Sequence, residues 1–86
     1  AMTSADVSAR VAAYLLDCEM TTGVGDQVRV RLPAPKKDIA SFLGTTPETL
    51  SRALATLARD GVIRQASKTE VDILDMARLE LRGAGA

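Results

Sequence analysis

Residues 36–63 read KKDIASFLGTTPETLSRALATLARDGVI, and this stretch decides the fold. A first short helix is indicated by apolar residues that share one face: Ile39, Ala40 and Leu43. A second helix is indicated by apolar residues at i, i+3, i+4 and i+7: Leu50, Ala53, Leu54 and Leu57. The two patterns meet at Gly44-Thr45-Thr46, where a glycine can adopt φ > 0 in a tight turn. The spacing predicts a helix-turn-helix over residues 36–60.

The second helix of this unit has clear signals at both ends. Thr46 can cap its start, and Pro47 stands at the first helical position, where its missing N–H is not needed. Gly61 follows Asp60 as a glycine suited to a left-handed helix end. We therefore expect this helix to span residues 47–60.

The flanking residues supply the elements that this unit lacks. Residues 6–19 carry an amphipathic helical pattern, and residues 28–32 alternate Val and Leu with Arg, which predicts a half-buried strand. Residues 62–74 predict a hairpin that turns at Ala66-Ser67-Lys68, and Asp75 can cap a short last helix.

These elements predict an α+β fold, mainly α: a winged helix-turn-helix with a three-helix core, a small antiparallel β wing and a short C-terminal helix. We expect one domain over residues 6–82, with the wing at 62–74. Ala1-Met2 resembles a vector-derived start, so residues 1–5 are interpreted as a tag or disordered start. Residues 83–86 are expected to be frayed.

The charge of the 86-residue chain is balanced overall but not locally. There are eleven basic and eleven acidic residues, yet residues 36–68 hold six basic and three acidic ones, a net charge of +3. A basic segment in a neutral chain is compatible with a nucleic-acid-binding face. The only aromatic residues, Tyr14 and Phe42, are expected in an otherwise aliphatic core.

Several classes of protein are disfavoured by missing residues. The chain has one cysteine and no histidine, so an intramolecular disulfide is excluded and a zinc site is not expected. Catalysis is not expected either, because there is no glycine-rich phosphate loop and no paired-carboxylate site. Cys18 is interpreted as a small core residue. No apolar run approaches membrane-spanning length, which favours a cytoplasmic protein without membrane contact.

The polar side of the second helix contains the candidate base-reading residues. At about 100° per residue, Glu48, Ser51 and Arg52 project away from its apolar side. Arginine can bind O6 and N7 of guanine, and glutamate can accept from the N4 amine of cytosine. The alternative interpretation is an exposed Glu48–Arg52 ion pair at i, i+4.

The candidate phosphate-binding residues flank this helix and lie at the wing turn: Lys36, Lys37, Thr46, Thr49, Ser67 and Lys68. Any one surface lysine can equally be a solvated charge. Arg64 fits either a wing contact or a charge at the strand edge, whereas Arg29 and Arg31 are interpreted as a solvated strand face.

The sequence resembles the C-terminal DNA-binding domain of the Crp/Fnr transcription regulators, from about Val7 through Leu81. The most specific part is residues 36–63, followed by the wing and the ending TEVDILDMARL. The resemblance implies that Glu48, Ser51 and Arg52, in the segment PETLSR, read bases in the major groove of double-stranded DNA. The E-x-x-S-R form is more similar to the Fnr branch than to the cyclic-AMP-receptor branch.

The same resemblance implies a TTGAT-like half-site in an inverted repeat, read by a homodimer of the full-length protein. This fragment alone can be monomeric. RNA polymerase is an implied partner, and no cofactor is implied for this domain, because the family's effector domain is not in this chain. Pro35 departs from the family, which often has a capping threonine there, and Cys18 does not match a cluster cysteine. The alternatives are a winged helix of another regulator class or a protein-interaction module.

Overall fold

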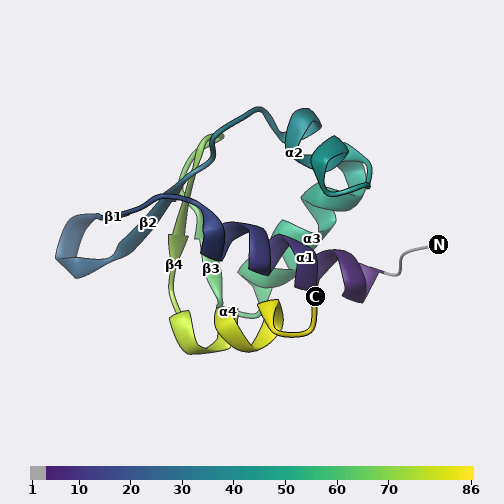
Figure 1. Cartoon of the computed structure of the whole chain (residues 1–86). Helices are drawn as coiled ribbons and strands as arrows, with labels where there is room; N and C mark the ends of the chain where they lie inside the picture. The colour runs from purple at the N-terminus through teal and green to yellow at the C-terminus, as the bar shows by residue number, and fades with distance from the viewer. Residues whose placement is uncertain (1–3) are drawn as a thin grey trace.

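The computed structural model describes residues 4–86. Its helices are α1 (Ser4–Asp17), α2 (Lys36–Phe42), α3 (Pro47–Arg59) and α4 (Met76–Gly83), with one 3-10 turn at Val24–Asp26. Its strands are β1 (Met20–Thr22), β2 (Val28–Arg31), β3 (Ile63–Gln65) and β4 (Glu70–Ile73). α2 and α3 form the predicted helix-turn-helix and β3–β4 the predicted wing (Figure 1). The predicted winged-helix class is confirmed.

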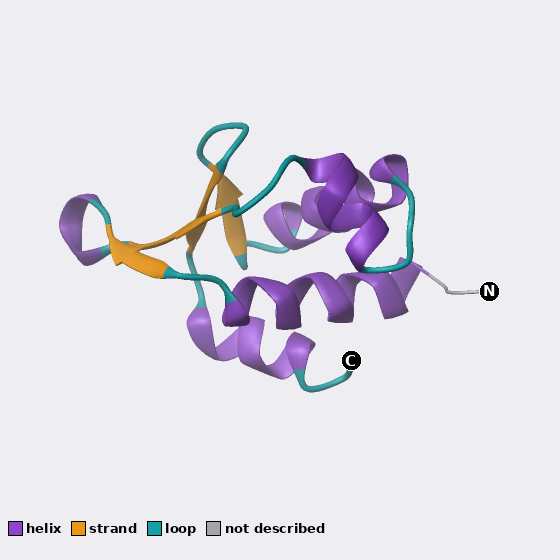
Figure 2. Cartoon of the chain, turned by 45° about the horizontal axis from the view of Figure 1, so that its top comes forward, coloured by secondary structure: helices purple, strands orange, loops and turns teal. Residues whose placement is uncertain are grey.

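The strands form one antiparallel sheet in the order β1-β2-β4-β3. β1 was not predicted. The strand has only three residues, Met20, Thr21 and Thr22, which are mostly exposed, so its sequence shows no alternation of apolar and polar side chains. β2 pairs with the wing strand β4, so the wing is anchored to the segment that precedes the helix-turn-helix (Figure 2). The paired β1 and β2 project to one side of the helices (Figure 2).

The core is aliphatic and lies where α1 meets the other helices and the inner face of the sheet. α1 lies between the α2–α3 pair and α4 (Figure 1). The most deeply buried large side chains come from every layer: Val11, Leu15, Val30, Leu50, Leu54, Leu57, Ile63, Val71 and Leu79. No helix within residues 4–86 is long and apolar enough to cross a membrane.

Both predicted glycine turns have the expected geometry. Gly44 has φ 73°, and the next residue, Thr45, donates its N–H to Ala40 O at 2.8 Å. Gly61 has φ 76°, and Val62 donates to Leu57 O at 3.0 Å. Each glycine thus closes a helix with a left-handed residue and a long backward hydrogen bond.

The prediction that Phe42 lies in the core is wrong. Phe42 is 78 % exposed, and its ring centroid lies 5.8 Å from that of the half-buried Tyr14. Phe42 is the last residue of α2 and projects about 160° around the helix from the buried Ala40. The core is therefore more strictly aliphatic than the composition suggested.

The prediction that Arg29 belongs to a solvated strand face is also wrong. Its side chain is 30 % exposed and forms an ion pair of 2.7 Å with the fully buried Asp72. Arg31, two residues further on the same face, is exposed as predicted. The two arginines differ because only Arg29 lies directly opposite an aspartate, in the pairing of β2 with β4.

Candidate nucleic-acid interface

The outward side of α3 presents the three candidate base-reading residues. Glu48, Ser51 and Arg52 are exposed, whereas the opposite side of the helix is buried: Leu50, Ala53, Leu54 and Leu57. Ala55, also exposed, leaves a low surface beside them. Because a small side chain does not hold the helix away from a groove floor, this side can approach base edges closely.

The alternative Glu48–Arg52 ion pair is absent. Within residues 4–86, the salt bridges join other residues, and none lies between these two side chains. The Arg52 guanidinium and the Glu48 carboxylate are thus available for contacts outside the chain.

Two predicted phosphate-binding lysines are brought to one groove. Lys36, at the start of α2, and Lys68, in the wing turn, both line a groove of about 640 Å³. Its remaining walls come from the segment before α2 and from Thr69, and Lys37 is exposed next to it. Lys36 and Lys68 are distant in sequence, so only the folded chain places their charges on one side of the molecule.

The predicted hydroxyl groups differ in how they are already bonded. Thr46 Oγ1 accepts from the Thr49 backbone N–H at 3.2 Å and donates to Thr49 Oγ1 at 3.0 Å. Its capping role is confirmed, and the Thr49 hydroxyl, which accepts from Thr46, keeps its own proton for donation. Ser67 donates to Glu70 at 3.3 Å, so a phosphate there has to displace a carboxylate.

Arginines on α1 and α4 hold the helix-turn-helix against the rest of the domain. Arg10, on α1, donates to Leu43 O at the C-terminal end of α2, over 3.0 Å. Arg82, on α4, forms an ion pair with Asp60, the C-cap of α3. The hydrogen bond from Arg82 lowers the pKa of the Asp60 carboxyl. α2 and α3 are therefore each fixed at one end, as a base-reading helix requires. Neither contact was predicted.

The wing is held by a carboxylate that the sequence analysis did not single out. Asp72 is fully buried and accepts hydrogen bonds from Arg29 and from Arg64 on the two neighbouring strands. These bonds, from Arg29 first and then Arg64, lower the pKa of Asp72 to about 2. Arg64 is therefore a structural ion-pair partner. The signal was the alternation Val71-Asp72-Ile73, which places Asp72 opposite arginines once the strand register is known.

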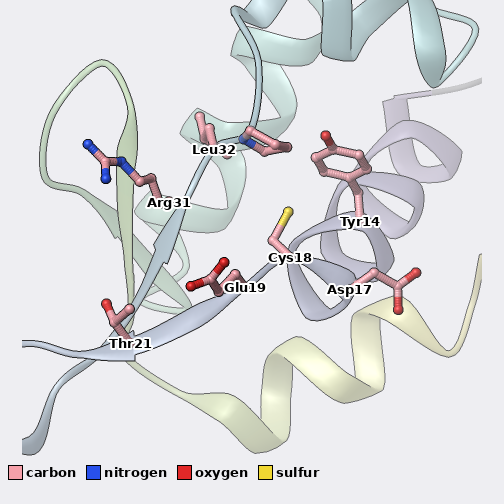
Figure 3. Close-up of a pocket in the computed structure, with 8 residues that line it drawn as sticks. Tyr14, Asp17, Cys18, Glu19, Thr21, Arg31 and Leu32 are labelled. Carbon is pink, nitrogen blue, oxygen red and sulfur yellow. The ribbon is translucent and has the colours of Figure 1, made fainter.

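The cavity around Cys18 lies at the C-terminal end of α1, and the residues that line it come from outside α3. It measures about 590 Å³, and Figure 3 shows Cys18 between Tyr14 and Leu32, with Asp17, Glu19 and Arg31 around the rim. Cys18 is only partly buried, at the edge of the core, and burial raises the pKa of its thiol. Among the described residues, no group of three or more His, Cys, Asp or Glu side chains could hold a metal ion.

Comparison with known proteins agrees with this geometry. Residues 9–82 match the model of the Crp-like helix-turn-helix domain. The chain belongs to this family. It is a helix-turn-helix DNA-binding domain of the Crp/Fnr type, whose members are transcription regulators rather than enzymes.

Individual relatives support the same assignment. The chain is 38 % identical over 74 residues to the probable transcriptional regulator flp of Lacticaseibacillus casei. This matched region covers 86 % of this chain and 32 % of that protein. It is 46 % identical over 48 residues to the transcriptional activator protein FnrL of Cereibacter sphaeroides, covering 56 % of this chain and 19 % of that protein. The chain thus spans a third or less of these relatives.

Among solved structures, a CRP-family transcriptional regulator from Thermus thermophilus is similar. It superposes with a TM-score of 0.78 at 30 % identity, over 93 % of this chain and 41 % of that one. The fold is therefore shared over most of the chain.

Proposed function

We propose that this chain binds double-stranded DNA sequence-specifically by inserting α3 into the major groove. The observation that carries the proposal is that α3 has one exposed and one buried side. Glu48, Ser51 and Arg52 are exposed, Glu48 and Arg52 form no ion pair within residues 4–86, and the opposite side is buried in the core. Arg52 would bind a guanine through O6 and N7, and Glu48 would accept from the paired cytosine N4 amine. Ser51 would contact an adjacent base.

The phosphate backbone would be held on the two flanks of α3. Lys36, Lys37 and Lys68 supply charge from α2 and the wing, and Thr49 supplies a hydroxyl at the start of α3. Thr46 acts through Thr49, because its own proton is donated to Thr49 Oγ1. Ser67 joins after releasing Glu70. These contacts fix register and orientation and do not specify sequence.

The target would be an inverted repeat of a TTGAT-like half-site, because the segment Glu48-Thr49-Leu50-Ser51-Arg52 has the Fnr-like form. An inverted repeat requires two copies related by a two-fold axis, with half-sites about one helical turn apart. The full-length protein would then be a dimer that acts together with RNA polymerase. One copy of this chain supplies only half of the contacts, so its own affinity is expected to be weak.

The test is selection of bound sequences from random DNA, using two copies of the chain joined to a dimeric leucine zipper. Recovery of a repeated TTGAT-like half-site is the expected result. Recovery of an unrelated half-site would overturn the Fnr-like specificity and keep the DNA-binding proposal. No enrichment, together with no salt-dependent binding to any duplex, would overturn DNA binding itself.

A further inference from the structure

A groove of about 290 Å³ runs between α1 and α3, next to the candidate base-reading residues. Its lining consists of two arginines, two hydroxyl residues and two alanines: Arg52, Arg59, Ser8, Thr56, Ala53 and Ala55. Within the described part of the chain, no carboxylate lines it. The groove therefore offers cations and hydroxyl donors, which is the chemistry that binds an oxyanion.

Arg59 brings a charge to this groove that no carboxylate of the described chain pairs with. Its Nη2 donates to Thr56 Oγ1 at 3.4 Å, and among residues 4–86 it forms no salt bridge. The neighbouring carboxylate, Asp60, is already bonded to Arg82 Nη2 at 2.5 Å. The Arg59 guanidinium can thus bind an anion without first breaking an ion pair.

Ser8 supplies a hydroxyl on the α1 side of the groove. The residue is only 7 % exposed, and within the described part of the chain its hydroxyl has no hydrogen-bond partner. Because no described side-chain polar atom is both fully buried and unpaired, the Ser8 hydroxyl retains some contact with solvent. Because Ser8 lines this groove, its hydroxyl is available as a donor to an anion bound there.

The position of Arg59 relative to Arg52 suits the edge of a DNA groove. The two residues are seven apart on the same side of α3, so they are separated by about 10 Å along the helix axis. The major groove is about 12 Å wide. With Arg52 at the base edges, Arg59 reaches the groove rim, where the backbone phosphates lie.

The geometry points to a further backbone-phosphate site, in which Arg59 binds one phosphate at the rim of the major groove, with the Thr56 and Ser8 hydroxyls as additional donors. This inference rests on the proposed function, because it requires α3 in the major groove. A guanidinium matches two phosphate oxygens with parallel N–H donors. The contact would add affinity on every sequence and leave base discrimination unchanged.

The first experiment measures how affinity depends on salt. The dimerised chain and its Arg59→Gln variant are titrated with a TTGAT inverted repeat and a scrambled duplex, between roughly 50 and 200 mM salt. Arg59→Gln should weaken both complexes by the same factor and reduce the slope of log K against log salt by about one per half-site. Arg31→Gln is the control, since Arg31 is an exposed arginine in the separate Cys18 cavity.

The second experiment locates the phosphate. Duplexes carry single uncharged methylphosphonates at successive backbone positions of one half-site. The wild-type chain should lose affinity at one rim position at which the Arg59→Gln variant loses none. Ser8→Ala should weaken binding to the unmodified duplex and reduce the loss at that same position.

The outcomes separate this inference from the proposed function. If the wild-type chain binds the repeat specifically and Arg59→Gln leaves the salt slope and the methylphosphonate profile unchanged, the Arg59 site is wrong and the proposed function stands. An equal effect of Arg31→Gln and Arg59→Gln on the slope would also overturn the site, because net charge alone would explain it. If the wild-type chain binds no duplex, both proposals fail.

Discussion

Arg29 Nε donates a hydrogen bond of 2.7 Å to Asp72 Oδ1, across the residue pair that joins β2 to β4. Arg64, opposite Asp72 on β3, donates to the other carboxylate oxygen. One buried carboxylate thus connects three neighbouring strands on the outer face of the sheet. A slip of one residue would turn Asp72 into the apolar core, so this cluster also specifies the register of the wing.

This cluster makes the stability of the chain sensitive to acid. The folded pKa of Asp72 is about 2, below its ordinary value of 3.8, so ionised Asp72 favours the folded state. The contribution is complete above about pH 4 and is lost as the pH falls through about 2. We expect the free energy of unfolding, measured with urea, to decrease across this interval.

Asp72→Asn is the matched variant, because it keeps the shape of the side chain and removes the charge. It should be less stable than the wild type at neutral pH, and the difference between the two should shrink as the pH approaches 2. A difference that stayed constant from pH 6 to pH 2 would show that Asp72 does not titrate as the structure requires.

Truncation of Phe42 should have little effect on stability, in contrast to truncation of a buried leucine. Leu57 is 0 % exposed, and Leu57→Ala should lower the free energy of unfolding by about 2–5 kcal/mol, through lost burial and a cavity. Phe42→Ala removes only an exposed ring in contact with Tyr14, so its cost should stay below about 1 kcal/mol. Denaturant titration of both variants measures the two losses in the free energy of unfolding. Equal losses would contradict the exposed position of Phe42 and place it in the core.

Gly61 is required for its backbone conformation rather than for space. A Cβ atom added there would meet nothing within 4 Å, but φ is +76°. Gly61→Ala should therefore cost about 1–2 kcal/mol of stability, since an alanine is strained in this region. Gly61→Asn is the control and should cost less, because asparagine adopts the left-handed region more readily. Equal stability of wild type and Gly61→Ala would contradict the argument.

Arg52 should determine specificity. Arg52→Ala is expected to cost roughly 1–3 kcal/mol of binding free energy on the selected half-site and to relax discrimination at the contacted base pair. The measurement is anisotropy titration against the selected site and all single-base variants. Equal losses on the selected site and on random DNA would show that Arg52 binds backbone instead.

Lys36→Ala provides the contrasting variant. It should weaken binding to the selected site and to random DNA to the same extent. It should also lower the slope of log K against log salt concentration by about one per half-site. A loss confined to the selected sequence would exclude a pure phosphate role for Lys36.

Much of the fold and one side of the candidate interface could be predicted because their signals are local. The apolar spacing from Ile39 to Leu57, the glycines at 44 and 61 and the cap at Thr46 each depend on residues within a few positions. The same spacing separates the exposed Glu48, Ser51 and Arg52 from the buried side of α3. These features belong to residues 36–63 by themselves.

The tertiary structure alone decided which distant side chains meet. From the sequence alone, Arg29 and Asp72 are charged residues on two separate strands. The pairing of β2 with β4 places them opposite each other. Lys36 and Lys68 line one groove, and Ser8 and Arg59 line another, only because separate segments pack together. Local periodicity sets which face of a helix or strand is apolar. Which charges are paired, and which remain for DNA, depends on the three-dimensional packing of those faces.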